Sequence, residues 1–410
     1  MSSAVASDPR VAPKAQPNRP ALDKLRASSW FEPLAFLVTA ALWVAAAVTW
    51  SQLCYRIGRP HATLGWDLVT SWHAVVVFAH GGQPYDLAQT DNRLFLYPPS
   101  SLLLMRPIAA LTLRQIQVVG LVVTAVAAWC AVMVSAHIAG RRWYGPTAAL
   151  CVLALHYARP MVAELSLQNA TILCLLALAG FWWLASRQHW MWAGVLVGLS
   201  MSLKPLLIVL LLIFLVERKW KPLAVAIAIP AALNAAAFVF VSDPAAVFRK
   251  LPSLVNRSGS GVLSNSAWVD VLRDFNLSSG SIDVIRLVTA AVALAAAWLA
   301  WRLIEDSALR LITVASSLLL GSYLAGTLSE DHYMLTMIPL LISLVLPGSP
   351  MRWFPAWVGF ALMMGLEPPR AWLGLGTVAN QSAWMAFGMM LVLLTITAAL
   401  ASRHKLAAAR

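Results

Sequence analysis

Charged side chains are scarce in this chain of 410 residues. Asp, Glu, Lys and Arg together make up 11% of the sequence, whereas 60% of the residues are hydrophobic. The mean hydropathy of +0.73 is higher than a soluble domain of this length would show. The shortage of charge therefore excludes a soluble protein and predicts one that crosses a membrane several times.

Cysteine is also scarce, and the motifs of nucleotide binding are missing. The four cysteines, Cys54, Cys130, Cys151 and Cys174, lie within or at the ends of apolar stretches, which excludes a disulfide framework and a metal motif. The sequence contains no Walker motif, no glycine-rich nucleotide loop and no Asp-x-Asp pair. These absences argue against a nucleotide-sugar donor held by a metal ion, and no cofactor is predicted.

Apolar stretches separated by short polar loops fill most of the chain. A helix that crosses the membrane fully needs about 20 residues. The sequence therefore predicts an all-α polytopic membrane protein with about twelve membrane helices, several of them short. They are expected at roughly 31–54, 115–139, 145–159, 169–186, 190–203, 205–217, 222–241, 283–302, 309–328, 333–346, 353–366 and 382–401.

Lys and Arg gather in loops on one side of this arrangement, which the positive-inside rule assigns to the cytoplasm. Two such clusters, Arg187 and Arg218-Lys219, bracket the stretch 190–217, so we expect that stretch to form a hairpin that turns at Lys204-Pro205. The net charge of +13 suits attraction to anionic lipid headgroups, so membrane lipid is an expected partner and nucleic acid is not.

The same reading divides the chain into three parts. Residues 1–29 are predicted to be a disordered cytoplasmic tail, 30–402 the membrane domain and 403–410 a second cytoplasmic tail. The first apolar run is too long for a cleaved secretory signal and is predicted to be an uncleaved anchor in the plasma membrane. Two outer segments, 55–114 and 242–282, are long enough to build a site.

Asp67 opens a stretch, 67–78, that has a mixed polar and apolar face and is expected to form a helix in the membrane interface. The carboxylate can cap that helix. At the outer boundary of the membrane it can also take a proton from an acceptor hydroxyl while a sugar phosphate leaves from the opposite face. The position of Asp67 favours this second role, although its residue type does not.

Three cationic or titratable side chains are candidates for holding a phosphate. Lys204 would lie at the outer end of a hairpin, where a charge near lipid is costly unless it meets a partner such as a lipid phosphate or snorkels to the interface. Arg159 would hold the donor phosphate or a lipid headgroup. His332 follows Glu330-Asp331 at the end of a span and would bind a phosphate or sugar hydroxyl, or lie in a solvated loop.

Other candidates are uncharged. Gln168 and Asn169 would donate amide hydrogen bonds to sugar hydroxyls, although Asn169 equally suits the start of the next helix. Trp268 lies in an outer segment, where its indole would stack on a sugar ring. Tyr97-Pro98-Pro99 predicts an extended entry into a short helix, in which the prolines are structural.

Taken together, these motifs resemble glycosyltransferase family 87, whose members are membrane enzymes of the GT-C fold that use polyprenyl-phosphate sugars as donors. The resemblance covers about residues 60–370. It rests on Asp67 together with Gly81-Gly82-Gln83-Pro84-Tyr85-Asp86, Phe95-Leu96-Tyr97-Pro98-Pro99, Leu167-Gln168-Asn169 and Gly198-Leu199-Ser200-Met201-Ser202-Leu203-Lys204-Pro205. Further segments, Ser242-Asp243-Pro244, Leu346-Pro347 and Pro355-Ala356-Trp357, are similar to those of actinobacterial arabinofuranosyltransferases in the family.

The resemblance implies that Asp67 is the catalytic base in the first outer loop. It also implies a polyprenyl-phosphate sugar donor and a glycan or glycolipid acceptor. The expected reaction is an inverting arabinofuranosyl transfer to arabinan on the outer, periplasmic face. Lys204 is expected on the side of the donor phosphate, Tyr97 and the other candidates are expected to bind the donor phosphate or the substrate, and the loop 242–282 is expected to shape the acceptor site. Three alternatives stay open: a mannosyltransferase acting on a phosphatidylinositol mannoside or lipomannan, a lipid-linked sugar transporter or flippase, and an inactive scaffold.

Overall fold

The computed structural model describes residues 31–59, 64–87, 94–259, 265–366, 368, 373 and 376–408. The predicted tail at 1–29 lies outside the described residues. At the other end, the last helix runs on to Ala408, so the predicted tail at 403–410 begins inside that helix. The regular secondary structure of the described part is helical, apart from one isolated antiparallel bridge between Asn265 and Glu330.

The α-helices are α2 (Phe31–Ile57), α3 (Trp66–Ala79), α5 (Pro99–Leu104), α6 (Leu113–Ile138), α7 (Pro146–Leu155), α8 (Arg159–Leu167), α9 (Thr171–Ser186), α10 (Trp190–Leu203), α11 (Leu211–Val216), α12 (Trp220–Phe240), α13 (Pro244–Gly259), α14 (Trp268–Asp274), α15 (Ser279–Leu303), α16 (Ser307–Ala325), α17 (Ile338–Ile342), α18 (Phe354–Met363) and α19 (Thr377–Ala408). Short 3-10 helices are η1 (Pro84–Asp86), η2 (Arg106–Ala110), η3 (Pro205–Leu210), η4 (Asp331–Met337), η5 (Ser343–Val345) and η6 (Pro350–Arg352).

Six of the described helices are long and apolar enough to cross a membrane, namely α2, α6, α12, α15, α16 and α19. The pair α7 and α8, bent by 69°, would make a seventh if it is one span. The structure thus differs from the predicted number of about twelve. All twelve apolar stretches are helical, but half of them are too short to cross alone. Prolines at the first or second residue of α8, η3, α17 and α18 divide these stretches, because a proline starts a helix well and interrupts one poorly.

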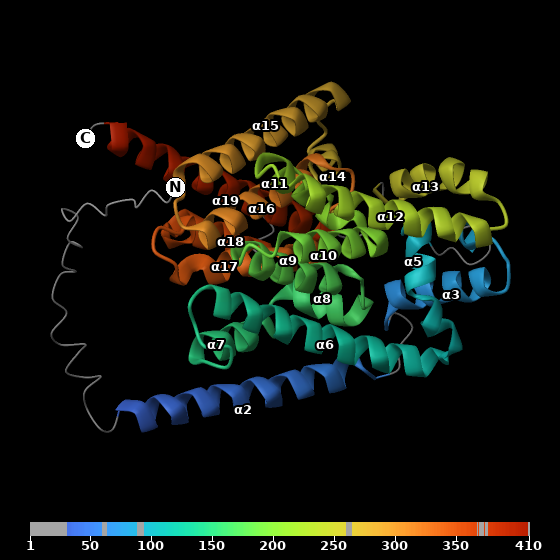
Figure 1. Ribbon diagram of the computed structural model, residues 1–410, viewed down its shortest axis with the longest axis horizontal. Coiled ribbons are helices and arrows are strands. Elements are labelled where there is room, and N and C mark those ends of the chain that lie inside the picture. The colour runs from blue at the N-terminus through green and yellow to red at the C-terminus, as the bar shows by residue number, and fades with distance from the viewer. Residues whose placement is uncertain are drawn as a thin grey trace, which may run out of the picture.

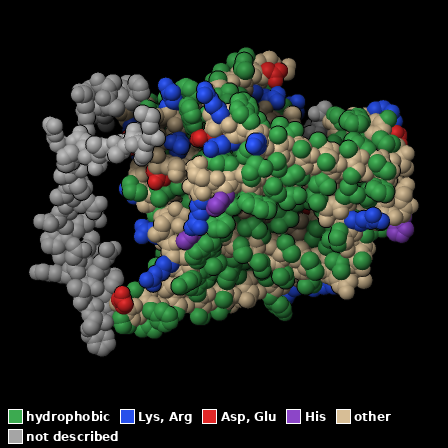
Figure 2. Space-filling view, viewed as in Figure 1, with side chains coloured by type: hydrophobic (Ala, Val, Ile, Leu, Met, Phe, Trp, Pro, Cys, Tyr) green, Lys and Arg blue, Asp and Glu red, His purple; other side chains and the backbone are tan. Residues whose placement is uncertain are grey.

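The long helices lie roughly along the long axis of the molecule, and α3, α5 and α13 gather at one end of it (Figure 1). Hydrophobic side chains cover much of the visible surface (Figure 2). On α6 they form a stripe, since Val118, Val122 and Val126 are 45%, 56% and 56% exposed at helical spacing. A stripe of this kind suits contact with lipid, as expected of a membrane protein.

The hairpin predicted at Lys204-Pro205 is confirmed by the packing of α10 against α12. Gly194 faces Pro222, and Gly198 faces Ala226, so residue numbers increase together along the two helices and they run parallel. The chain between them, η3 and α11, must therefore run back in the opposite direction. Small residues at this contact let the two backbones approach closely, as they do between membrane helices generally.

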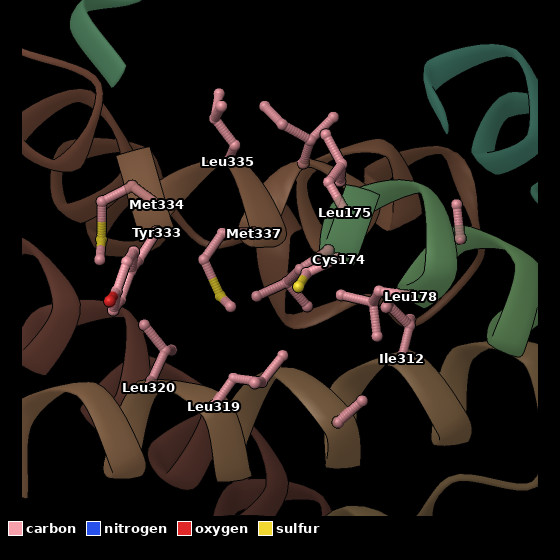
Figure 3. Close-up of a cluster of buried hydrophobic side chains, with 14 of the residues drawn as sticks. Cys174, Leu175, Leu178, Ile312, Leu319, Leu320, Tyr333, Met334, Leu335 and Met337 are labelled. Atoms are coloured by element: carbon pink, nitrogen blue, oxygen red, sulfur yellow. The ribbon is translucent and has the colours of Figure 1, made fainter. Parts of the chain in front are cut away.

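A buried apolar cluster holds η4 between α9 and α16. In Figure 3, Cys174, Leu175 and Leu178 of α9 and Ile312, Leu319 and Leu320 of α16 surround Tyr333, Met334, Leu335 and Met337. Because η4 is anchored on both sides, the loop that precedes it, which contains Glu330, has a fixed place in the fold.

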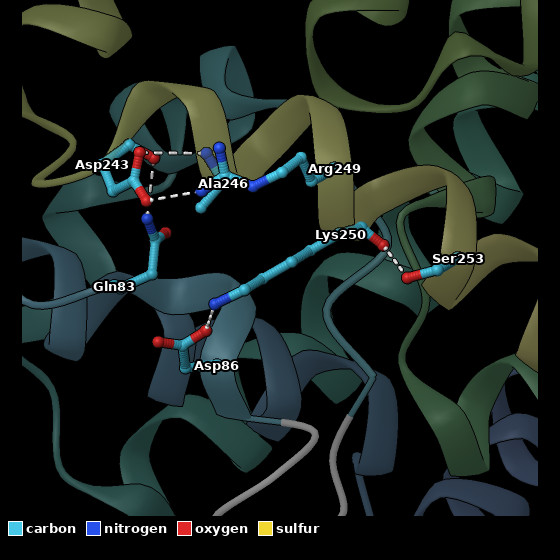
Figure 4. Close-up of polar contacts among 7 residues, drawn as sticks. All are labelled: Gln83, Asp86, Asp243, Ala246, Arg249, Lys250 and Ser253. Atoms are coloured by element: carbon cyan, nitrogen blue, oxygen red, sulfur yellow. Dashed lines mark hydrogen bonds and ion pairs between the residues drawn. The ribbon is translucent and has the colours of Figure 1, made fainter.

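The two segments predicted to lie at the outer face, 55–114 and 242–282, are tied to each other by contacts between their described residues (Figure 4). Gln83 Nε2 donates to the carbonyl oxygen of Asp243 at 2.9 Å, and Lys250 of α13 forms an ion pair with Asp86. The Asp243 carboxylate accepts a hydrogen bond from the Ala246 amide at 3.0 Å, which caps α13. These contacts fix α13 over the loop that follows α3.

The α10–α12 contact yields a stability prediction. A Cβ at Gly194 would lie 2.5 Å from the carbonyl oxygen of Pro222, which is backbone and cannot move aside cheaply. Gly194→Ala should therefore lower the unfolding temperature, at a cost of about 1–3 kcal/mol, as measured by thermal unfolding in lipid nanodiscs. Gly280→Ala is the matched control, because nothing lies within 4 Å of a Cβ there. Equal melting of the two variants would contradict the close packing.

Candidate active site

A cavity of about 250 Å³ lies where the start of α3, the C-terminal end of α10 and the loop after α16 meet. Elements far apart in the sequence thus contribute side chains to one concave site, as is usual for binding pockets. Its polar and aromatic lining consists of Asp67, Thr70, Tyr97, Asn169, Lys204, Glu330 and Tyr333, and its apolar lining of Leu94, Leu96, Pro205, Leu206 and Leu328.

The local backbone explains how Asp67 reaches this cavity. Gly65, with φ of 67°, turns the chain into α3, and its amide donates to the carbonyl oxygen of Ser166 at 2.7 Å. Gln168 packs against this turn and donates through Nε2 to the carbonyl oxygen of Gln117 at 2.8 Å. Gln168 therefore fixes the start of α3 against α6 and α8, and it is not among the residues that line the cavity.

Asp67 is joined to Lys204 through a single amide side chain. Asn169 Nδ2 donates to Asp67 Oδ2 at 2.7 Å, and Asn169 Oδ1 accepts from Lys204 Nζ at 2.7 Å. Lys204 Nζ also donates to Thr171 Oγ1 at 2.9 Å, and the Thr171 amide donates to Asn169 Oδ1 at 3.0 Å. Asn169 thus serves the start of α9 and the cavity together, so the two roles predicted for it are compatible.

The charge of Lys204 is held inside the protein. The residue is 7% exposed and extended, with φ of −149°, at the turn between α10 and η3. Its ammonium lies 4.2 Å from the ring centroid of Tyr333 and 5.9 Å from that of Tyr97, within the range of cation–π attraction. Because its hydrogen bonds go to Asn169 and Thr171, Lys204 does not snorkel to the membrane interface.

A second charged group lies beside the first. Glu330 lines the cavity, and its Oε2 is 3.3 Å from Nε2 of the fully buried His332. The next residue, Asp331, forms an ion pair of 2.8 Å with Arg159. His332 and Arg159 therefore contact carboxylates of the 330–331 loop and stand one step behind the lining of the cavity.

The environments of the two cavity carboxylates push their pKa values apart. Burial raises the pKa of Asp67, and the negative charge of Glu330 raises it further, against the opposing effects of His332, Asn169 and Lys204. Burial on its own would raise the pKa of Glu330 as well, but His332 and Lys204 lower it to about 2. Two carboxylates tuned in opposite directions commonly have different tasks in one site.

The structure brings four of the predicted site residues, Asp67, Tyr97, Asn169 and Lys204, to the cavity. Trp268 is elsewhere: it is 5% exposed, packs against Phe387, and donates through Nε1 to Thr289 Oγ1 at 3.0 Å. Its expected stacking on a sugar has no support in this arrangement, because the indole belongs to the core.

Sequence reasoning did not single out Glu330, Tyr333 or Thr171 as lining or supporting the site. For Glu330 a signal was present, because two adjacent acidic residues directly after an apolar span are unusual. Tyr333 and Thr171 look like ordinary span residues. Only the three-dimensional contact with Lys204 distinguishes them.

Comparison with known proteins gives consistent matches. The sequence model of glycosyltransferase family 87 matches residues 95–327. The chain is 30% identical, over 380 residues, to an alpha-(1->3)-arabinofuranosyltransferase of Mycobacterium tuberculosis, present in strains CDC 1551 and H37Rv, covering 88% of this chain and 82% of the relative. An enzyme of the same name from Mycolicibacterium smegmatis is 26% identical over 344 residues, which cover 81% and 78% of the two chains. No solved structure matches.

The raised pKa of Asp67 predicts a stability effect with a definite sign. An acid whose pKa is higher in the folded than in the unfolded state costs stability when ionised, and this cost disappears below the unfolded pKa. Asp67→Asn should therefore melt a few degrees above the unchanged protein at pH 7, and the gap should close as the pH falls. Asp283→Asn, at a side chain 71% exposed, is the control. A lower melting temperature for Asp67→Asn at pH 7 would contradict the assignment.

Proposed function

Because this chain belongs to glycosyltransferase family 87 and is a membrane glycosyltransferase, we propose that it transfers an arabinofuranosyl residue from a polyprenyl-phosphate donor to a cell-envelope arabinan. The observation that carries the proposal is the hydrogen-bonded chain from Asp67 through Asn169 to Lys204 along one cavity. It supports the proposal because it brings a carboxylate and an ammonium, the two groups that the reaction needs, to the same small cavity. Transfer is proposed to take place at the outer face of the plasma membrane, since the Lys and Arg clusters assign the opposite face to the cytoplasm.

The proposed base is Asp67. Its Oδ2 accepts a hydrogen bond from Asn169, which orients the carboxylate and leaves Oδ1 to accept a proton from the acceptor hydroxyl. The acceptor oxygen then forms a bond to the anomeric carbon of the donor sugar. The bond between that carbon and the phosphate oxygen breaks, and its electron pair leaves with the phosphate. One displacement of this kind inverts the anomeric centre. The burial that raises the pKa of Asp67 also makes its carboxylate a stronger base than an exposed aspartate.

The proposed phosphate site is centred on Lys204. A phosphate leaving group gains negative charge as its bond breaks, and a preorganised cation in a buried site stabilises that charge. The ammonium of Lys204 is already held in place by Asn169 and Thr171 before any donor arrives. The apolar lining at Pro205 and Leu206 continues into η3, along which the isoprenoid part of a lipid donor could enter.

Arabinofuranose is proposed as the sugar because the relatives named above are arabinofuranosyltransferases. The test uses the full chain in lipid nanodiscs, with decaprenyl-phosphate arabinose or decaprenyl-phosphate mannose and a short synthetic arabinan or mannan acceptor. Transfer from the arabinose donor alone is the expected result. Transfer from the mannose donor alone would mean that the donor sugar is mannose, with the proposed mechanism unchanged. If folded protein transfers neither sugar, a transporter or a scaffold is favoured instead.

The base assignment predicts that Asp67→Asn lowers kcat by about 10²–10⁴-fold, the usual contribution of a general base. Asp283→Asn, which removes an exposed carboxylate on α15, should leave kcat unchanged. Radiolabel transfer from the lipid donor measures both. Equal loss in the two variants, or none in Asp67→Asn, would exclude Asp67 as the base.

The proposed role of Asp67 also predicts how the rate of transfer depends on pH. Asp67 must be ionised to take a proton, and burial raises its pKa. The rate should therefore fall as the pH drops through this raised pKa, which lies above the ordinary range of aspartate. The measurement is kcat/KM against pH, which reports groups of the free enzyme. A profile that stays flat down to the ordinary range of aspartate would contradict a raised pKa.

The phosphate assignment predicts that Lys204→Gln raises the KM for the lipid donor by about 10- to 100-fold, as expected for a lost hydrogen bond to a charged group. Glutamine can still bond to Asn169, so the fold is expected to survive. Lys219→Gln, at the other end of the hairpin, is the control. An unchanged KM for the donor together with a raised KM for the acceptor would move Lys204 to the acceptor side.

A further inference from the structure

The cavity contains a carboxylate that the proposed displacement leaves without a task. A single displacement with a phosphate leaving group needs one base, and Asp67 supplies it. Glu330 lines the same cavity, where a second negative charge raises the cost of ionising Asp67. A charge that opposes its neighbour in a functional pocket calls for an explanation beyond stability.

The backbone around Glu330 is held unusually firmly for a loop. Asn265, of the second outer segment, forms an antiparallel bridge with Glu330. Its side chain accepts from the Ser329 amide at 2.7 Å and donates to the carbonyl oxygen of Thr327 at 3.0 Å, and Ser266 N donates to the carbonyl oxygen of Ser329 at 2.7 Å. From the other side, η4 is anchored in the core. The carboxylate of Glu330 is therefore preorganised rather than carried on a mobile loop.

The charge state of Glu330 limits what it can do. Its ion pair with His332 and the nearby Lys204 keep its pKa low, so the group is ionised at any physiological pH. An ionised carboxylate accepts hydrogen bonds and donates none, and a group with such a low pKa is a poor base near neutrality. The chemistry that remains is to accept hydrogen bonds from hydroxyl groups, which sugars supply in pairs on adjacent ring carbons.

The position of Glu330 relates it to the donor sugar. In an inverting displacement the reacting sugar lies between the base and the departing phosphate. Glu330 lines the same cavity of about 250 Å³ as Asp67 and Lys204, so a sugar held between those two groups lies in a small space that Glu330 also borders. The acceptor approaches from the Asp67 side, and the ring hydroxyls of the donor face the walls of the cavity.

On this basis we propose that Glu330 accepts hydrogen bonds from ring hydroxyls of the donor sugar and is a specificity-determining residue of the site. Asn265 is then the positioning residue that connects the second outer segment to sugar recognition. The inference rests on the proposed function, because it assumes a sugar-phosphate donor whose anomeric carbon lies between Asp67 and Lys204. The inference adds to that function a carboxylate, Glu330, that discriminates between donor sugars.

The test is a thermodynamic cycle that combines one change in the protein with one change in the donor sugar. The kcat/KM is measured for the full chain and for Glu330→Gln, with intact decaprenyl-phosphate arabinose and with synthetic analogues that each lack one ring hydroxyl. For the unchanged protein, loss of the contacted hydroxyl should cost about 10- to 100-fold, because it removes a hydrogen bond to a charged group. In Glu330→Gln that same loss should cost much less, while losses of the other hydroxyls keep their cost.

The proposal would be overturned if the loss of every hydroxyl cost the same factor in kcat/KM in Glu330→Gln as in the unchanged protein. A Glu330 with a merely structural role would lower the rates with all donors by one common factor. Glu305→Gln, at an exposed position before α16, is the control and should leave every ratio unchanged. If Glu330→Gln does not fold, Glu330→Asp keeps the charge, shortens the side chain and supports the same cycle. Where turnover is too slow, the Kd values for the same set of donors give the cycle instead. Absence of transfer by the unchanged protein would count against the proposed function, whereas the cycle tests Glu330 alone.

Discussion

The burial of one positive charge organises the site. Lys204 is 7% exposed in a chain in which charge is rare, and an ammonium in such a place is stable only with close partners. Asn169 and Thr171 take its hydrogen bonds, the rings of Tyr333 and Tyr97 face it, and Glu330 lies nearby. These partners come from the start of α9, from η4 and the residue before it, and from the loop before α5, so these three parts are placed with respect to Lys204 at the end of α10. The structure keeps this cation in position in the lining of a cavity where a phosphate is proposed to bind.

Much of the fold could be predicted from the sequence, because apolar stretches of the right length leave few alternatives to helices in a membrane. All twelve stretches are helical, and the hairpin at Lys204-Pro205 followed from charge placement alone. The number of full crossings did not follow. Whether a helix of 14 residues such as α10 spans the bilayer or packs inside the bundle depends on the helices around it. The hydropathy of a segment contains no information on those tertiary contacts.

Site residues could be predicted from the sequence where their place relative to an apolar stretch indicates where they lie in the fold. Asp67 was singled out for its position beyond the first apolar stretch, Lys204 because a charge near lipid is costly, and Asn169 because its amide lies in a short loop before a span. Trp268 was expected to stack on a sugar because its segment was predicted to be an exposed outer loop, whereas α14 packs its indole against α19. The pairing of Glu330 with the same cavity depends on the antiparallel bridge to Asn265, more than 60 residues away, which no local pattern encodes.

The amide of Asn169 has a consequence for proton movement. Hydroxyl and carboxyl groups can pass a proton along a chain by receiving one and releasing another, but a side-chain amide between Asp67 and Lys204 cannot do so at ordinary pH. In the proposed mechanism, the proton that Asp67 takes from an acceptor therefore cannot pass along this hydrogen-bonded chain to the departing phosphate. Solvent in the cavity is then what removes the proton from the base. The return of Asp67 to its ionised state would thus depend on contact between the cavity and water, and not on the cation that holds the phosphate.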